Sequence, residues 1–226
     1  MSPLRTWRSF WLTATTLAIL AALVPAAQAD ITQSTPSLPP QGLYTTGTVC
    51  FPNLGPGVCI VGTSLYGFTG TTSVIGGGGQ SIDSSISLAA DIYTDNNGMP
   101  GTLIGQVSLG GPIGIFYSGR TSDAELGTFT SSLTELDLTG QFNGHTIELI
   151  VNPNMTSSGP TTVAPSGGQF HISSFFDVFT ELSIDHGAFV PGPPRTFVLT
   201  PEPGSLSLLA LGLAGVLGKL RHRPRA

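Results

Sequence analysis

The chain has 226 residues, of which 40% are hydrophobic and only 9% are charged, and it contains 30 glycines and 18 prolines. Disordered chains combine low hydrophobicity with high net charge, so this composition excludes a charge-rich disordered protein. The frequent Gly and Pro residues argue against a helical bundle and favour many short strands.

The charges are distributed unevenly along the chain. Residues 30–200 contain twelve acidic residues but only two basic ones, Arg120 and Arg195, so this part has a formal charge of −10. A body of that charge repels phosphate groups and anionic membrane surfaces. We therefore expect no nucleic-acid partner.

Residues 1–29 have the features of a secretory signal peptide: a positively charged start, an apolar run and small residues at a cleavage site. The alternative is a buried core helix. Ala27 and Ala29 occupy the positions that signal peptidase reads, so cleavage is expected to give a chain that begins at Asp30.

Residues 30–48 are rich in Ser, Thr, Pro and Gln, which predicts an extended linker or a loosely docked first strand. In residues 49–200, short apolar runs alternate with turn residues, as is typical of an antiparallel β-sandwich with a jelly-roll-like body. The expected strands are 58–66, 81–93, 102–109, 113–117, 126–138, 146–151, 169–184 and 196–199.

Two segments of the body carry the clearest strand patterns. Apolar residues in 81–93 alternate with polar ones, and the turn-forming residues 95–101 should close a hairpin after them. Between Phe170 and Ile184 most apolar residues share one parity and most polar residues the other. That pattern predicts a strand with one buried face and a second face that is partly covered.

Cys50 and Cys59 are the two cysteines of the chain. The segment between them contains two prolines and two glycines and can turn back easily, so both sulfurs can meet. In an oxidising compartment the expected outcome is a disulfide, and the alternative is a pair of free buried thiols. The spacing is not that of a zinc site.

The body shows no motif of a known catalytic or nucleotide-binding centre. Asp177 and Glu181 would lie about 13 Å apart on one strand, beyond the separation of a glycosidase pair, so solvated face residues are expected. Oxygen ligands near Asp95 make calcium conceivable, although an Asx-rich turn explains them better. We therefore expect no enzyme activity, no metal and no cofactor.

The end of the chain has three parts in a fixed order. The first is Pro201, Glu202 and Pro203, and the second is an apolar run over 205–218. As a helix this run of 14 residues spans about 21 Å, which makes a short membrane span. The third part is a basic cluster, which should stay cytoplasmic and stop the helix sliding outward; its residues are Lys219, Arg221, Arg223 and Arg225.

This tail over residues 200–226 resembles the PEP-CTERM sorting signal of Gram-negative bacteria. The resemblance implies that an exosortase recognises and removes the tail, that the inner membrane holds the protein before processing, and that the product reaches the cell surface or the extracellular space. Such proteins are often exported by bacteria that make exopolysaccharide, which is a candidate partner. The alternative is a plain C-terminal membrane anchor.

Two functions fit these observations. The first is an exported, non-catalytic protein of the cell surface or extracellular matrix. The second is a glycan-binding or carbohydrate-active β-sandwich module. Glycan sites favour exposed aromatic residues, and residues 30–226 contain no Trp, which disfavours the second function. The candidates for such a site are Tyr44, Tyr66, Tyr93 and Tyr117, and packing in the core explains them equally well.

Overall fold

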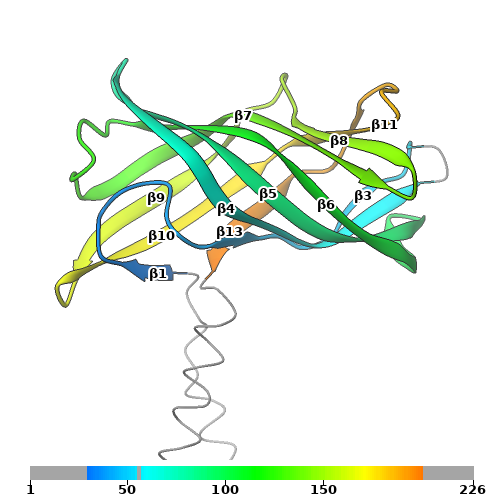
Figure 1. Cartoon of the computed structure of the whole chain (residues 1–226), viewed down its shortest axis with the longest axis horizontal. Coiled ribbons are helices and arrows are strands. Elements are labelled where there is room, and N and C mark those ends of the chain that lie inside the picture. Colours follow the sequence, from blue (N-terminus) through cyan, green and yellow to red (C-terminus); the bar gives the residue numbers. More distant parts are fainter. Residues whose placement is uncertain (1–29, 55–56, 201–226) are drawn as a thin grey trace, which may run out of the picture.

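The computed structural model describes residues 30–54 and 57–200, which form an all-β, antiparallel body (Figure 1). This confirms the predicted fold class, while the expected signal helix and hydrophobic tail helix lie outside the described residues. The strands are β1 (Asp30–Gln33), β2 (Leu43–Thr45), β3 (Val49–Phe51), β4 (Val58–Gly76), β5 (Gly79–Asn96), β6 (Met99–Ser118), β7 (Gly127–Phe142), β8 (His145–Val151), β9 (Ser157–Ser166), β10 (Gln169–Val178), β11 (Thr180–Ile184), β12 (Val190–Pro191) and β13 (Arg195–Thr200).

All thirteen strands belong to one antiparallel sheet that closes on itself. From β4 to β7, each strand pairs with the next along the chain. The second edge of β7 pairs with β9 along its first half and with β8 along its second half. β9 then pairs with β10, and β8 pairs with β11. β10 pairs with β13, β13 with β2 and β2 with β4, which completes the ring.

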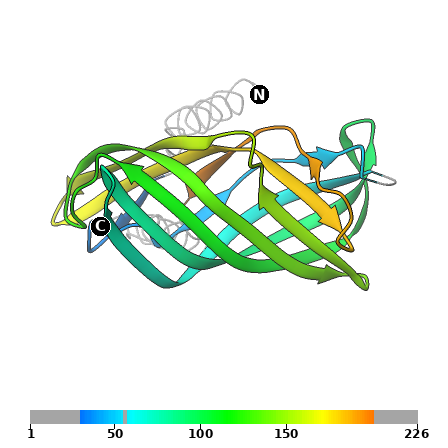
Figure 2. The same cartoon turned by 90° about the horizontal axis from the view of Figure 1, so that it is seen from above.

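The ring is flattened, and its long strands run obliquely to its long axis (Figure 2). Its opposite walls face each other as the two layers of a sandwich do. The two layers are therefore connected parts of one sheet, and the successive pairing from β4 to β8 replaces the longer crossovers of a jelly roll. The strands predicted at 102–109 and 113–117 are joined within β6.

The inside of the ring is the hydrophobic core. Along β5, residues of even number point inward, and Ile82, Ile86, Leu88 and Ile92 are buried. β10 and β11 follow the predicted parity, with Ile172, Phe176, Val178 and Leu182 buried. Alternation of period two thus places one face of each strand in the core.

The hairpin between β5 and β6 turns at Asn97 and Gly98, as the sequence predicts. Both residues have positive φ, 53° and 82° respectively. This left-handed pair is the conformation that Asn-Gly favours in a tight hairpin turn, because glycine has no Cβ to clash. The turn residues therefore set the register of the longest hairpin in the body.

β9 is a strand that the sequence pattern did not predict. It contains Gly159 and two prolines, and such residues argue against a strand inside a sheet. A Cβ on Gly159 would lie 1.9 Å from the carbonyl oxygen of Phe175 on β10. Glycine is therefore needed here so that the neighbouring backbone can approach, and β9 can close the ring between β7 and β10.

Residues 30–48 contribute β1 and β2 to the sheet. Ile31 on β1 and Tyr44 on β2 are buried in the core. β1 pairs with residues 170–173 of β10, and β13 pairs with residues 175–178 of the same strand. Because β1 and β13 lie end to end along β10, the chain enters and leaves the described body at the same place (Figure 1).

Candidate functional site

The junction between the body and the predicted sorting tail lies at Thr200, the last residue of β13. Thr200 pairs with Leu43, and its hydroxyl donates to the Leu43 carbonyl at 3.0 Å. The last described residue is thus held within the sheet. Pro201, Glu202, Pro203 and the basic residues Lys219, Arg221, Arg223 and Arg225 lie outside the described residues.

The predicted signal-cleavage site has a similar position where the described chain begins, at β1. Asp30 is the first residue of β1, and its carboxylate lies 3.3 Å from Nε2 of His171 on β10. The Asp30 side chain is only 13% exposed. Cleavage before Asp30 would therefore leave β1 intact. Ala27 and Ala29 lie outside the described residues.

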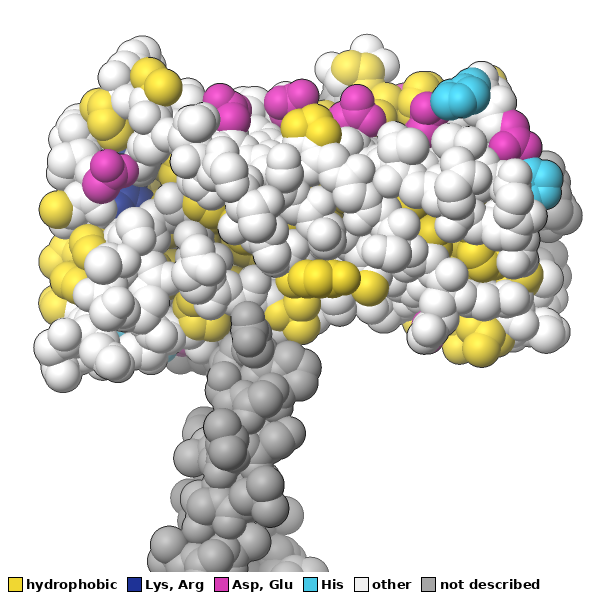
Figure 3. All heavy atoms as spheres, viewed as in Figure 1, with side chains coloured by type: hydrophobic (Ala, Val, Ile, Leu, Met, Phe, Trp, Pro, Cys, Tyr) yellow, Lys and Arg dark blue, Asp and Glu magenta, His cyan; other side chains and the backbone are white. Residues whose placement is uncertain are grey.

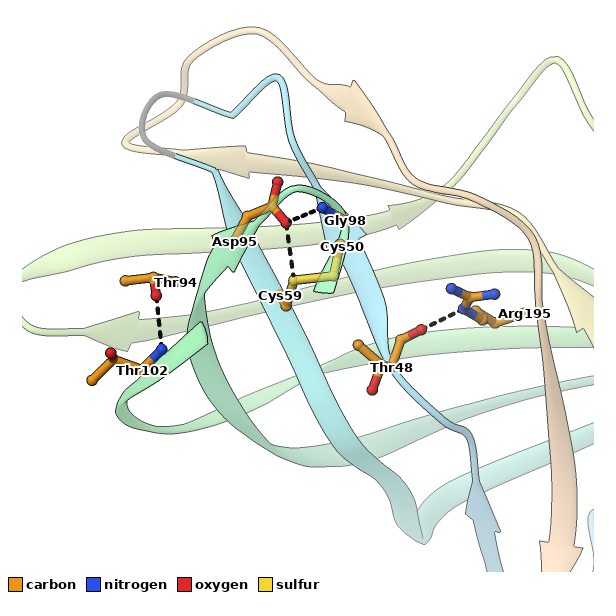
Figure 4. The surroundings of a disulfide bond; sticks show 8 residues. All are labelled: Thr48, Cys50, Cys59, Thr94, Asp95, Gly98, Thr102 and Arg195. Carbon is orange, nitrogen blue, oxygen red and sulfur yellow. Dashed lines mark hydrogen bonds between the residues drawn. A yellow bond between two sulfur atoms is a disulfide. The ribbon is translucent and has the colours of Figure 1, made fainter. Parts of the chain in front are cut away.

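Cys50 and Cys59 form the predicted disulfide, which joins directly paired residues of β3 and β4 (Figure 4). Asp95 lies beside it, with Oδ1 3.6 Å from the Cys59 sulfur. The same oxygen accepts a hydrogen bond from the Gly98 amide at 2.7 Å. Asp95 therefore stabilises the β5–β6 turn next to the disulfide, and the bonded sulfurs offer no thiolate for a metal.

Two histidine–carboxylate pairs lie at the same end of the ring as the disulfide. Nδ1 of His145 lies 2.7 Å from Asp185, and Nδ1 of His186 lies 2.8 Å from Glu148. Each pair connects a residue of β8 to the turn after β11. These residues are about 40 positions apart in sequence, which is why the sequence pattern does not reveal the pairs.

The hydrogen bond from His145, with a second from the Thr146 amide, holds the pKa of Asp185 below its usual range. A carboxylate with a lowered pKa in the folded state contributes stability above its unfolded pKa, and that contribution is lost as the pH falls through the folded pKa. The Asp185 interactions therefore support the fold at neutral pH and weaken in acid.

Arg120 closes the opposite end of the ring. It is fully buried although arginine is usually exposed. Its guanidinium donates to the carbonyls of Pro36 at 2.7 Å, Asp123 at 2.7 Å and Ser122 at 3.1 Å. It also lies over the Phe129 ring, 5.4 Å from the centroid. Burial lowers the pKa of Arg120, but an arginine stays charged at neutral pH.

The surface of the body is acidic. Each of the twelve acidic residues of 30–200 is at least partly exposed, whereas Arg120 is buried and Arg195 is half-buried and donates to the Thr48 carbonyl. Acidic side chains gather along the upper part of the face in Figure 3. The predicted negative surface is therefore not neutralised by exposed basic residues of the described body.

Two of the four tyrosines are part of the core. Tyr44 and Tyr117 are buried, and burial raises the pKa of both hydroxyls. Tyr66 on β4 is 40% exposed and lines an outer hollow of about 450 Å³ over β4, β5 and β6. In this hollow Gln106 donates to Asp91 at 2.9 Å. Small residues form the rest of its lining, among them Gly62, Ser64 and Ala89.

Comparison with known families finds one motif in the chain. The family model of the PEP-CTERM protein-sorting motif matches residues 199–223. The chain is thus a protein that contains a PEP-CTERM sorting domain, and this motif supports exosortase-dependent sorting of an exported, membrane-passing protein to the cell surface. No curated protein and no solved structure matches the chain.

The structure contains no helix within residues 30–54 and 57–200 that is long and apolar enough to cross a membrane. The short membrane helix predicted for residues 205–218 lies outside those residues.

Proposed function

We propose that this chain is a non-catalytic protein of the cell surface or extracellular matrix, which signal peptidase and an exosortase process at its two ends. The supporting observation is that the sorting motif starts at Leu199, inside β13. Within the described residues, the last strand ends at Thr200, directly before Pro201. Removal of the tail after this point would therefore leave the whole sheet intact.

The same arrangement suggests how the tail acts. The prolines on both sides of Glu202 have fixed φ and no amide hydrogen, so the motif is expected to be extended and accessible. The apolar run holds it at the inner membrane, and the basic end sets its orientation. The exosortase supplies the chemistry, whereas this chain supplies only the recognised segment.

Glu202→Ala tests the role of the motif. We expect the variant to keep its full tail and to stay in the inner-membrane fraction, while wild type loses the tail. Glu135→Ala, which changes an exposed acid of β7, is the matched control and should be processed normally. The measurement is the C-terminal mass of the protein from cells with and without an exosortase. An intact tail on the surface protein in both strains would contradict the proposal and support a plain anchor.

A second candidate function, glycan binding, is favoured by the outer hollow at Tyr66. Sugars commonly stack on an exposed aromatic ring and bond through hydroxyls to carboxylate and amide groups, and Tyr66, Asp91 and Gln106 offer these groups together. β4 has irregular pairing on both sides of this point, which opens the hollow. Exopolysaccharide is the corresponding partner.

Tyr66→Ala tests this second function. If the hollow binds glycans, the exported protein should retain ligands from a glycan array or from the exopolysaccharide of the producing cell, and the variant should lose at least tenfold in affinity. Tyr93→Ala is the control, because Tyr93 does not line the hollow. Equal retention by wild type and Tyr66→Ala would exclude this surface.

A further inference from the structure

The ring contains an apolar cavity of about 270 Å³ at the end that carries the disulfide. Residues from β4, β5, β7, β8 and β11 line it, and all but one of them are aliphatic or aromatic. His145 is the exception and lies at the exposed start of β8. The lining residues are Val58, Ile60, Ile92, Phe142, His145, Ile147, Leu182 and Ile184.

The two ends of the ring are built differently. At the far end, Arg120 fills the interior and bonds to carbonyls of two loops. At this end, Val58, Phe142 and Ile184 are only partly buried, although they face the cavity. An apolar interior that stays accessible at one end of a closed sheet is a common form of ligand pocket.

Cross-links are concentrated around this cavity. The disulfide includes Cys59, which lies between the lining residues Val58 and Ile60. His145 lines the cavity and pairs with Asp185, the residue that follows Ile184. Binding to a preformed pocket requires little ordering of side chains, so a rim held in this way favours affinity.

We propose that this cavity binds a neutral molecule with a short aliphatic chain. At about 30 Å³ per methylene, close to the volume of a water molecule in the liquid, the cavity holds a chain of roughly nine carbons. The lining offers hydrogen-bonding groups only at His145, so the buried part of the ligand is apolar.

The negative charge around the cavity determines which polar end group the ligand can carry. Asp95, Glu148 and Asp185 lie near the mouth, and the body has a formal charge of −10. An anionic head, such as a fatty-acid carboxylate, is repelled there, whereas an alcohol or ester is not. This site is formed by residues of the described body alone and does not depend on the proposed sorting.

Calorimetric titration of the exported protein, purified without detergent, with 1-octanol and with sodium octanoate at pH 8 tests the proposal. Octanol is expected to bind at one site, and octanoate at least tenfold more weakly. Ile184→Phe should fill the cavity and weaken octanol binding at least tenfold. Ile150→Phe is the matched control, because Ile150 lies on β8 with the opposite parity and does not line the cavity.

Circular dichroism must show the same β signature for each variant. If Ile184→Phe does not fold, Val58→Phe fills the cavity from its partly exposed rim. Absence of octanol binding to wild type, or equal binding to wild type and a folded cavity-filled variant, would overturn the site. Octanoate binding as tight as octanol binding would overturn the neutral class of ligand.

Discussion

Arg120→Met is expected to lower the free energy of unfolding by about 3–5 kcal/mol. Methionine retains much of the apolar length of the side chain but leaves the carbonyls of Pro36, Ser122 and Asp123 without their donor. A hydrogen bond from a charged group contributes roughly 1.5–3 kcal/mol, and burial of the guanidinium offsets part of this in wild type. Urea unfolding of the exported protein, followed by circular dichroism, measures the change.

Arg195→Met is the control for this experiment, because Arg195 is the other basic residue of the body and is only half-buried. Its guanidinium donates to one carbonyl, that of Thr48. A loss of about 1 kcal/mol is expected. A similar loss of unfolding free energy in both variants would show that burial gives Arg120 no special role in stabilising its end of the ring.

Replacement of both Cys50 and Cys59 by serine is expected to cost about 3 kcal/mol, since the disulfide closes a loop of about ten residues in the unfolded chain. When reductant is added, the urea midpoint of wild type should fall to the midpoint of the double variant. The double variant itself should not respond to reductant. A wild-type midpoint that is the same with and without reductant would contradict a stabilising role.

Parts of the body with a clear local pattern could be predicted from the sequence. The alternation in β5, the parity of β10 and β11 and the Asn-Gly turn each depend on residues close together in the chain. The disulfide could be predicted because two nearby cysteines in a chain expected to be exported have few other outcomes. The sorting motif was recognisable because its three parts are consecutive.

Features that depend on distant parts of the chain could not be predicted in this way. β9 has one buried large apolar residue, Val163, so its role in closing the ring is not visible in hydrophobic periodicity. Arg120 was apparent only as one of two basic residues in the body. Its burial depends on carbonyls of two loops, one of them more than 80 residues away.

The candidate ligand surfaces were likewise hidden in the sequence. The cavity draws its lining from five strands between Val58 and Ile184, and no local motif connects them. Tyr66 could be named as a candidate, but the local sequence does not distinguish it from Tyr44, which is buried. Exposure is set by whether each tyrosine points into or out of the ring, and that is a property of the closed sheet.

The position of Thr200 determines how mechanical force enters the body. β13 is bonded on both edges, to β10 and to β2, whereas β1 among the described residues pairs with β10 alone. Backbone bonds between antiparallel strands lie perpendicular to the strand, so tension along β13 from its end loads them together in shear. A tail held at a membrane would therefore transmit a pull from that membrane into a strand that has neighbours on both sides, and not into a singly paired one.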